Sequence, residues 1–349
     1  MKGLNIIIIS LLFINGCTSV STRLIRDKKG NIIPGSVVLL EKVKLGEMYQ
    51  WIQIRGYDTS NPVLLWLHGG PGAAQMPIAH HFNGALEKDF IVVHWDQRGA
   101  GKSNPTDFDE QTMTIKQFIS DAHELTRYLK NRFNKRKIYL VGHSWGTLLG
   151  IQLAYKYPED YYAYIAVSQV IDSYASNEIA YKWLVKQIKK RGKNKDLKRL
   201  KKLGAPPFTD HEKYVKFAKM VDSCGGGMDI GFARLVWIAL RAPEYNLTDY
   251  FAWFRGANRG SGPMWDSTRS CNIFQEVHKL KIPVYFFSGK NDYNTPLQLV
   301  KKYFETLEAP KGKDLVIFEK SAHTPFIKET EKFNMEMVRV KEETYSLKK

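Results

Sequence analysis

Apolar residues follow two different periods along the chain. Between residues 37 and 55 they alternate with polar residues, which predicts paired strands at 37–45 and 49–55. Six further runs are apolar at successive positions, as expected for strands that are covered on both faces. These runs lie at Val63–Leu67, Phe90–Trp95, Lys137–Val141, Tyr164–Val167, Val284–Ser288 and Leu315–Phe318.

Helical periodicity separates several of these runs, at residues 114–132, 146–157 and 296–307. Strands that alternate with helices form βαβ units, so the sequence predicts an α/β fold with a mostly parallel sheet flanked by helices. The alternation stops at residues 172–271, where the pattern is helical and contains no convincing strand. We interpret this segment as a helical cap inserted into a core made of residues 36–171 and 272–349.

The strongest chemical signal is the segment Gly142-His143-Ser144-Trp145-Gly146, which lies between a predicted strand and a predicted helix. A G-x-S-x-G segment in that position forms a tight turn that exposes the serine hydroxyl. The turn also directs the next backbone N–H, here that of Trp145, toward an oxyanion. Because the flanking elements fit, we interpret Ser144 as a nucleophile rather than as part of a structural turn.

A second glycine-rich turn, at residues 68–72, follows the predicted strand at 63–67 directly. Acyl transfer needs two N–H donors on the developing oxyanion, and a turn without side chains can present one of them. We assign this role to the N–H of Gly70, with Gly69 as the fallback. His68 precedes the turn, and we expect it to pack or to form hydrogen bonds.

Two later loops can supply the remaining catalytic groups. Asp292 follows the predicted strand at 284–288, and His323 follows the last predicted strand. Functional residues of open α/β sheets lie at such strand ends, and the order Ser, Asp, His suits a triad of this kind. We predict that His323 is the general base for Ser144 and that Asp292 orients the imidazole.

Together these segments resemble the proline iminopeptidase group of α/β-hydrolases. The matching segments are residues 68–72, 96–103 and 142–146, in the order that the family has them. The resemblance implies the α/β-hydrolase fold, the triad, and cap carboxylates that bind a free N-terminal ammonium. The cap lacks the Glu-Asn-His-Tyr-Phe-like stretch of that group, so the candidates for this role are Glu178, Glu212 and Glu244.

The second half of the predicted cap is rich in aromatic residues. Trp237 and Trp253 are candidates for the wall of an apolar substrate pocket. Packing among the cap helices themselves explains the same residues equally well, so both interpretations stay open.

The formal net charge is +17, and much of the excess falls between residues 182 and 219. No nucleic-acid-binding motif accompanies this lysine-rich stretch, so we expect a solvated helical face and no nucleic-acid partner. Attraction to acidic lipid headgroups is the second interpretation. The sequence contains no CxxC or HExxH pattern, and the predicted chemistry requires no metal and no organic cofactor.

The N-terminus resembles a bacterial export signal. A short basic start precedes the apolar stretch from Leu4 to Ile14, and Ile14-Asn15-Gly16-Cys17 is similar to a lipobox. The resemblance implies a signal peptide at 1–16, lipidation of Cys17, and an exported lipoprotein anchored to a membrane of the bacterial cell envelope. Residues 17–35 would form a tether. A plain cleaved signal with an incidental cysteine is the alternative.

Cys224 and Cys271 are the two other cysteines. In an exported protein they could form a disulfide, or they could be two buried free thiols. Neither lies in a segment that marks a nucleophile.

These observations predict a serine hydrolase that cleaves an amide or ester through an acyl-enzyme. The first hypothesis is a prolyl-aminopeptidase-like peptidase acting on short peptides. The second is a carboxylesterase acting on small acyl esters. A non-catalytic, lipid-anchored binding protein is the alternative from another functional class. Epoxide hydrolases and dehalogenases of this fold are disfavoured, because they place Asp where Ser144 stands. The sequence leaves the oligomeric state open.

Overall fold

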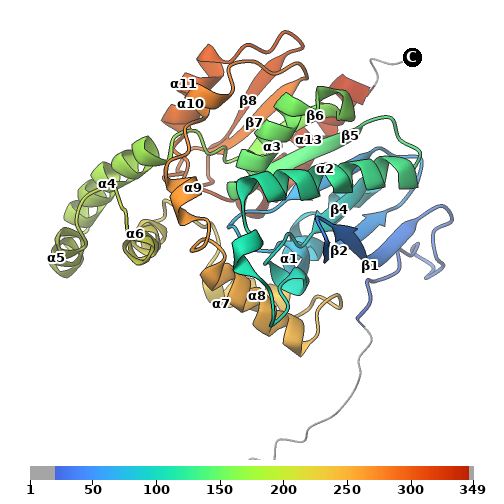
Figure 1. The fold of residues 1–349 in the computed structure, drawn as a ribbon, viewed down its shortest axis with the longest axis horizontal. Helices are drawn as coiled ribbons and strands as arrows, with labels where there is room; N and C mark the ends of the chain where they lie inside the picture. Colours follow the sequence, from blue (N-terminus) through green and yellow to red (C-terminus); the bar gives the residue numbers. More distant parts are fainter. Residues whose placement is uncertain (1–19, 346–349) are drawn as a thin grey trace, which may run out of the picture.

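The computed structural model describes residues 20–345, and an eight-stranded sheet forms the centre of this part of the chain (Figure 1). The strand order across the sheet is β1-β2-β4-β3-β5-β6-β7-β8. The strands span β1 Val37–Leu45, β2 Met48–Gly56, β3 Val63–Leu67, β4 Ile91–Trp95, β5 Ile138–His143, β6 Tyr161–Val167, β7 Val284–Gly289 and β8 Lys313–Phe318.

The sheet is parallel from β4 through β8, and only β1 and β2 run antiparallel to their neighbours. Every residue of β3, β4, β5 and β7 is buried. Strands of that kind need a covering layer on both faces, which agrees with their uninterrupted apolar sequences. The predicted α/β class with a mostly parallel sheet is therefore confirmed.

Helices cover both faces of the sheet. On one face, α2 (Ile115–Arg132), α3 (Trp145–Lys156) and α11 (Leu297–Thr306) contribute apolar side chains to a first hydrophobic core. On the other face, α1 (Met76–Phe82), α12 (Pro325–Lys328) and α13 (Thr330–Tyr345) contribute to a second. Short 3-10 helices lie at Gly84–Lys88, Gly101–Ser103, Glu110–Thr112 and Pro158–Asp160.

The helices between β6 and β7 form what we call the cap, residues 172–271. Its first half packs around a hydrophobic core of its own, which includes Leu184, Leu200 and Phe217. Its second half instead joins the second core of the sheet through Ile238 and Trp253. The cap helices are α4 (Ser173–Lys190), α5 (Asn194–Leu203), α6 (His211–Ser223), α7 (Phe232–Ala239), α8 (Leu247–Arg259) and α9 (Trp265–Arg269), and α10 (Ile273–Glu276) leads back to β7.

The lysine-rich stretch runs from the second half of α4 through α5 to α6, and α5 is the helix at the far end of the cap in Figure 1. Leu200 is the buried residue of that helix, whereas Lys195, Lys198 and Lys201 are exposed. This arrangement is the solvated helical face that the charge pattern predicts. Cys224 and Cys271 are both buried and both free, so the structure favours the thiol interpretation over the disulfide.

Part of the segment expected to be a tether, residues 21–25, is held against the rest of the fold, which corrects the expectation for these residues. Ile25 is buried, and the Thr22 hydroxyl accepts hydrogen bonds from Gln53 and Arg55 of β2. The buried side chain of Ile25 and the hydrogen bond from Arg55 to Thr22 hold this stretch in place. The predicted signal and Cys17 lie outside the described residues. Within residues 20–345, no helix combines the length and the apolar character needed to cross a bilayer.

Candidate active site

Ser144 occupies the turn between β5 and α3. Its backbone has φ 52° and ψ −119°, a conformation that non-glycine residues rarely adopt and that turns the side chain out of the sheet edge. The two flanking glycines make the turn possible. A Cβ at Gly142 would lie 2.6 Å from the carbonyl oxygen of Gly146, and one at Gly146 would lie 2.2 Å from the carbonyl oxygen of Leu67. Both distances exclude a side chain.

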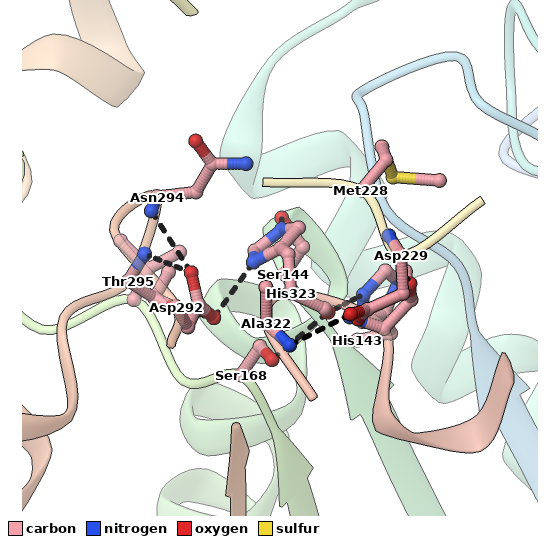
Figure 2. A network of polar contacts seen from close by, with 12 residues as sticks. His143, Ser144, Ser168, Met228, Asp229, Asp292, Asn294, Thr295, Ala322 and His323 are labelled. Atoms are coloured by element: carbon pink, nitrogen blue, oxygen red, sulfur yellow. Dashed lines mark hydrogen bonds and ion pairs between the residues drawn. The ribbon is translucent and has the colours of Figure 1, made fainter. Parts of the chain in front are cut away.

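Three side chains from distant parts of the chain meet beside this turn (Figure 2). The His323 Nε2 atom lies 2.8 Å from Ser144 Oγ, and His323 Nδ1 lies 2.9 Å from Asp292 Oδ2. Asp292 comes from the loop after β7, and His323 comes from the loop after β8. The imidazole is therefore placed to accept the serine proton through Nε2 while Nδ1–H donates to the carboxylate.

The Asp292 carboxylate is buried and receives hydrogen bonds on both oxygens. Oδ1 accepts the backbone N–H groups of Asn294 and Thr295, each at 2.9 Å. Oδ2 accepts the Thr295 hydroxyl at 2.6 Å in addition to the imidazole. Burial alone would raise the pKa of Asp292, but His323 and these donors together hold it below the ordinary value of 3.8. Asp292 is therefore ionised at neutral pH.

The same pairing acts on His323 in the opposite sense. Burial alone would lower its pKa, but the Asp292 carboxylate raises it above 6.5, with smaller contributions from Asp222 and Asp229. The neighbouring His143 behaves differently, because burial lowers its pKa to about 3 and keeps its ring neutral. Its Nε2–H donates to the carbonyl oxygen of His323 at 3.0 Å, as does the Ser168 hydroxyl at 3.0 Å. These two donors fix the backbone of the base.

The backbone groups nominated for an oxyanion hole lie beside Ser144. Trp145 is the first residue of α3, and the first N–H groups of a helix have no acceptor within it. Gly69, Gly70 and Trp145 all line the cavity that Ser144 enters. A Cβ at Gly69 would lie 3.3 Å from Ser144 Cβ, which shows how closely the glycine turn approaches the serine. N–H groups at these places can stabilise negative charge.

His68 and the loop at 96–103 support these turns from behind. Burial lowers the pKa of His68 to about 4, so its neutral ring accepts the Gln97 N–H at Nε2 and donates from Nδ1 to the Gly69 carbonyl. In the loop, Arg98 forms a fully buried ion pair with Asp121 at 3.0 Å. These bonds are internal to the fold, and for His68 they confirm the expected packing and hydrogen-bonding role.

The cap also holds the loop that carries His323. Asp229 Oδ1 accepts the Ala322 N–H at 2.8 Å, and Oδ2 accepts the N–H of Thr324 at 2.9 Å. The N–H of His323 itself donates to the carbonyl oxygen of Gly227 at 3.0 Å. Three consecutive backbone N–H groups of the core thus donate to one short segment of the cap. Figure 2 shows two of the residues concerned, Ala322 and Asp229. The position of the base therefore depends on how this segment is folded.

A cavity of about 770 Å³ opens between the core and the cap. Its walls include Ser144, His323 and many apolar cap residues, and Asp222 is the one carboxylate among the described residues that line it. Asp222 Oδ1 accepts the Met228 N–H at 3.0 Å, and within the described residues no ion pair joins it to a cation. Burial raises the pKa of Asp222 above 3.8. Asp222 is only half-buried, but a carboxylate that is partly withdrawn from water without a paired cation favours a cationic ligand.

The structure corrects most of the substrate contacts nominated in the cap. Glu178 and Glu212 are exposed, and Glu212 pairs with Lys216 on the surface. Glu244 is buried but accepts the Gln53 side-chain amide at 2.7 Å, away from the cavity lining. Trp237 is 55% exposed on the outer face of α7. Helical spacing alone does not tell which face of a cap helix points inward, which explains these errors.

Trp253 is the nominated cap residue that does line the cavity. Its ring is buried, and its Nε1–H donates to the carbonyl oxygen of Ala74 at 2.9 Å. Phe254 and Trp265 line the same cavity. Trp253 therefore serves both interpretations that the sequence left open, since it packs within the fold and presents an aromatic wall to the cavity.

Sequence reasoning missed Asp222 and Asp229. Both flank the segment Cys224-Gly225-Gly226-Gly227-Met228, and three consecutive glycines inside a helical region are an unusual signal. That signal marks a loop where backbone atoms approach other groups closely, and it could have drawn attention to the two aspartates. Within residues 20–345, no group of three or more His, Cys, Asp or Glu side chains is arranged to hold a metal.

Comparison with known proteins gives the family. A model described as the alpha/beta hydrolase fold matches residues 62–330. The chain belongs to the α/β-hydrolase family. It is 34% identical to the probable aminopeptidase YbaC of Bacillus subtilis over 85% of this chain and 94% of that protein. It is 26% identical to a proline iminopeptidase of Saccharolobus solfataricus over 86% of this chain and 90% of the relative.

A solved structure of this group supports the fold. The proline iminopeptidase of Mycobacterium smegmatis superimposes with a TM-score of 0.64 over 88% of this chain and 100% of that one, at 16% identity. The protein is thus a hydrolase of the α/β-hydrolase family and a proline iminopeptidase-like member of it. The resemblance to that group inferred from the sequence motifs is confirmed.

Proposed function

We propose that the protein is a serine hydrolase that works through an acyl-enzyme. Ser144 Oγ attacks a substrate carbonyl while His323 Nε2 takes its proton, and Asp292 stabilises the resulting imidazolium. The backbone N–H groups of Gly70 and Trp145 stabilise the oxyanion. The imidazolium then protonates the leaving amine or alcohol, and water hydrolyses the ester at Ser144 by the same proton transfers in reverse order. The 2.8 Å contact between Ser144 and His323 carries this proposal.

For the substrate, we propose a short peptide with a free N-terminus, cleaved after its first residue. An α-amino group is largely protonated at neutral pH and needs an anionic partner when it is taken out of water. Asp222 lines the same cavity as Ser144 and has no cation paired with it among the described residues. The names of the relatives, aminopeptidase and proline iminopeptidase, point to the same substrate class.

A second candidate is an esterase acting on small acyl esters. Trp253, Phe254, Trp265 and Leu235 give the cavity a largely apolar wall. An apolar wall binds an acyl group without any ammonium partner. This candidate shares the triad chemistry with the first and differs from it only in the use of Asp222.

One assay series separates the two candidates. Prolyl and alanyl arylamides are offered with a free and with an acetylated amine, beside aryl esters of the same acyl groups. A peptidase of the proposed kind loses activity when the amine is blocked. In the Asp222→Asn variant, kcat/KM for free-amine substrates should fall by about 10- to 100-fold, as expected for removing one partner of a buried charge pair, with little change for esters.

Glu212→Gln serves as the matched control, since Glu212 is an exposed cap carboxylate that pairs with Lys216. Its kinetics should equal those of the wild type. Hydrolysis that is indifferent both to amine blocking and to Asp222→Asn would remove the peptidase proposal and leave the esterase.

We further propose that the protein is exported and anchored through a lipid on Cys17. The support is the apolar stretch from Leu4 to Ile14 followed by the lipobox-like segment. The mass of the N-terminal peptide of the membrane-extracted protein tests this. A diacylglyceryl-modified cysteine at residue 17 is expected, and an unmodified N-terminus beyond residue 17 would contradict it.

A further inference from the structure

The outer face of α7 and α8 exposes large apolar side chains. Trp237 on α7 is 55% exposed, and Leu240 at the C-terminal end of this helix is 58% exposed. On α8, Leu247 is 71% exposed and Phe251 is 66% exposed. Leu247 and Phe251 are four residues apart and so share one side of α8. The Tyr250 hydroxyl donates to the carbonyl oxygen of Ala239 at 2.6 Å, which joins the two helices near these residues. Soluble proteins seldom leave such clusters without a partner.

The charges around this cluster have one sign. Among residues 231–260 the exposed charged side chains are Arg234, Arg241 and Arg259. The two acidic residues of the stretch add no free negative charge to this surface, because Glu244 is buried and Asp249 pairs with Lys102 at 2.5 Å. The Arg241 guanidinium lies over the Trp237 ring, 3.1 Å from its centroid. Aromatic, aliphatic and arginine side chains together are typical of surfaces that enter an anionic lipid headgroup layer.

The first described residues of the chain lie next to the connection between α7 and α8. The N–H of Ser21 donates to the carbonyl oxygen of Pro243, and Arg23 donates to that of Arg241, both at the connection between α7 and α8. Figure 1 shows the N-terminal end of the described chain on this side of the molecule. Cys17 is four residues before Ser21, so it lies within about 14 Å of it even if the chain is fully extended. Any lipid on Cys17 is therefore held close to this face.

We propose that the outer face of α7 and α8 is a membrane-docking surface that inserts into the headgroup layer of an anionic bilayer. The apolar side chains of Trp237, Leu240, Leu247 and Phe251 enter the layer, and the three arginines contact lipid phosphates. The link from Ser21 to Cys17 is short, so the lipobox-like segment stays on the same side of the molecule as this face. For that reason its proposed partner is a bilayer rather than a second protein chain. The docking does not depend on which substrate the enzyme cleaves.

Docking on this face sets the position of the active-site cavity. Phe232, at the start of α7, is 69% exposed and also lines the cavity, so the cavity extends to the exposed start of one docking helix. Leu235 of α7 and Phe254 of α8 line the cavity from the inside. The two helices thus separate the bilayer from the cavity, and a substrate concentrated at the lipid surface would reach Ser144 over a short path.

The test measures how deeply this face enters a bilayer. The full chain carries a nitroxide at Phe251→Cys, and the matched control carries it at Met335→Cys on α13, which lies away from α7 and α8 in Figure 1. Met335 is 72% exposed, close to the value for Phe251. The wild-type chain is labelled in parallel to account for its own cysteines. Collision with a water-soluble nickel chelate and with oxygen is measured with and without phosphatidylcholine–phosphatidylglycerol vesicles.

We expect the vesicles to reduce chelate collisions at residue 251 by about fivefold or more while oxygen collisions rise, as for interfacial helices. Residue 335 should not change. Adding Leu247→Glu to the labelled chain should restore at least half of the chelate access, without change in hydrolysis of a soluble substrate. Protection should be weaker on pure phosphatidylcholine.

Chelate access at residue 251 that stays the same on anionic vesicles would overturn the proposal, even in a chain that is anchored through Cys17. Protection that appears without vesicles and grows with protein concentration would overturn it too, and would show that a second copy of the chain covers the face.

Discussion

The catalytic loops of the core and the helices of the cap line the same cavity, but they are held in different ways. In the core, Ser144 lies on a turn where close backbone contacts at Gly142 and Gly146 exclude a side chain. Asp292 accepts four hydrogen bonds. In the cap, the half-buried Asp222 carboxylate accepts one backbone hydrogen bond and has no paired cation among the described residues. The residues of the triad are therefore held in one geometry by the fold, whereas Asp222 on the cap side of the cavity can still bind a cationic group of a ligand.

The two halves of the cap differ as well. The first half has its own hydrophobic core, whereas the second half packs into the core beneath the sheet. The Tyr245 hydroxyl donates to the buried Asp96 carboxylate, and Lys102 pairs with Asp249. Burial raises the pKa of Asp96 to about 7. The second half is thereby fixed to the loop at 96–103, whereas the first half is joined to the loop after β7 by the stacked rings of Trp183 and Tyr293.

The largest effect is expected from the most tightly held group. Asp292→Asn keeps the shape of the side chain but removes the charge that holds the correct imidazole tautomer. We expect kcat to fall by about 10⁴-fold, the loss typical of this change in a serine triad. Asp314→Asn on β8, at a half-buried ion pair with Arg339, is the control and should leave kcat unchanged. A loss below tenfold in folded Asp292→Asn protein would contradict the assigned role.

The rigidity of the elbow predicts the next effect. In Gly146→Ala the new methyl group would meet the carbonyl oxygens of Leu67 and His68 at 2.2 and 2.8 Å, both backbone atoms. We expect the free energy of unfolding to fall by about 3 kcal/mol, as for strong overpacking. Gly84→Ala is the matched control, because its Cβ would meet nothing within 4 Å. Equal thermal unfolding of the two variants would show that the turn is softer than the structure indicates.

The hydrogen bonds from the cap to the His323 loop predict a smaller effect. Asn in place of Asp229 can accept from Ala322 or Thr324, but it presents an N–H to the other donor. We expect kcat to fall by about 10- to 100-fold, the cost of a catalytic group displaced by a fraction of an ångström. The acidic limb of the pH profile should also move to lower pH, because a negative charge near His323 is lost.

If Asp229 had a purely structural role, Asp229→Asn would lower the amount of folded protein but would leave the acidic limb of the pH profile unchanged. Glu212→Gln again serves as the control, and its profile should match the wild type. An unshifted limb with full activity per folded molecule would show that the cap does not position the base.

The pH dependence of the wild type follows from the raised pKa of His323. The imidazole must be neutral to accept the serine proton, so a pKa above 6.5 keeps the enzyme inactive to a higher pH than a free histidine would. We expect kcat/KM to fall to half its plateau at a pH above 6.5 and to decrease further toward acid. A plateau that extends unchanged to pH 5 would contradict the pairing of His323 with Asp292.

The smallest effects are expected from the surface glutamates. Glu178→Gln and Glu212→Gln should change stability by less than about 0.5 kcal/mol and leave KM for free-amine substrates unaltered. A large rise in KM for either variant would mean that the cap rearranges to bring these side chains into the cavity.

The fold and the core of the site could be predicted because they depend on local sequence. The elbow glycines, the glycine turn at 68–72 and the loops after the last two strands are each tied to a strand end, so their positions follow once the strands are found. Strand limits deviate little, as at β6, which begins at Tyr161 instead of Tyr164. Helix α13 was not among the predicted helices, although its buried residues Phe333, Met337 and Val340 follow a helical spacing.

The cap contacts could not be predicted because they depend on packing between helices far apart in sequence. The glycine run after Asp222 marks a loop, but it does not show that Asp222 faces the cavity whereas Glu244 bonds to Gln53. The contacts that residues 21–25 of the expected tether make with β2 could not be predicted for a similar reason. These contacts, with Gln53 and Arg55, involve residues about thirty positions away, and a polar composition does not reveal them.

The most direct test is whether Ser144 reacts as an activated nucleophile. A fluorophosphonate probe is added to the folded wild type and to Ser144→Ala, and the modified peptide is identified by mass. We expect one phosphonylated residue, Ser144, and no labelling of the alanine variant. A folded wild type that stays unlabelled would contradict the catalytic account and favour a binding protein that keeps the hydrolase fold.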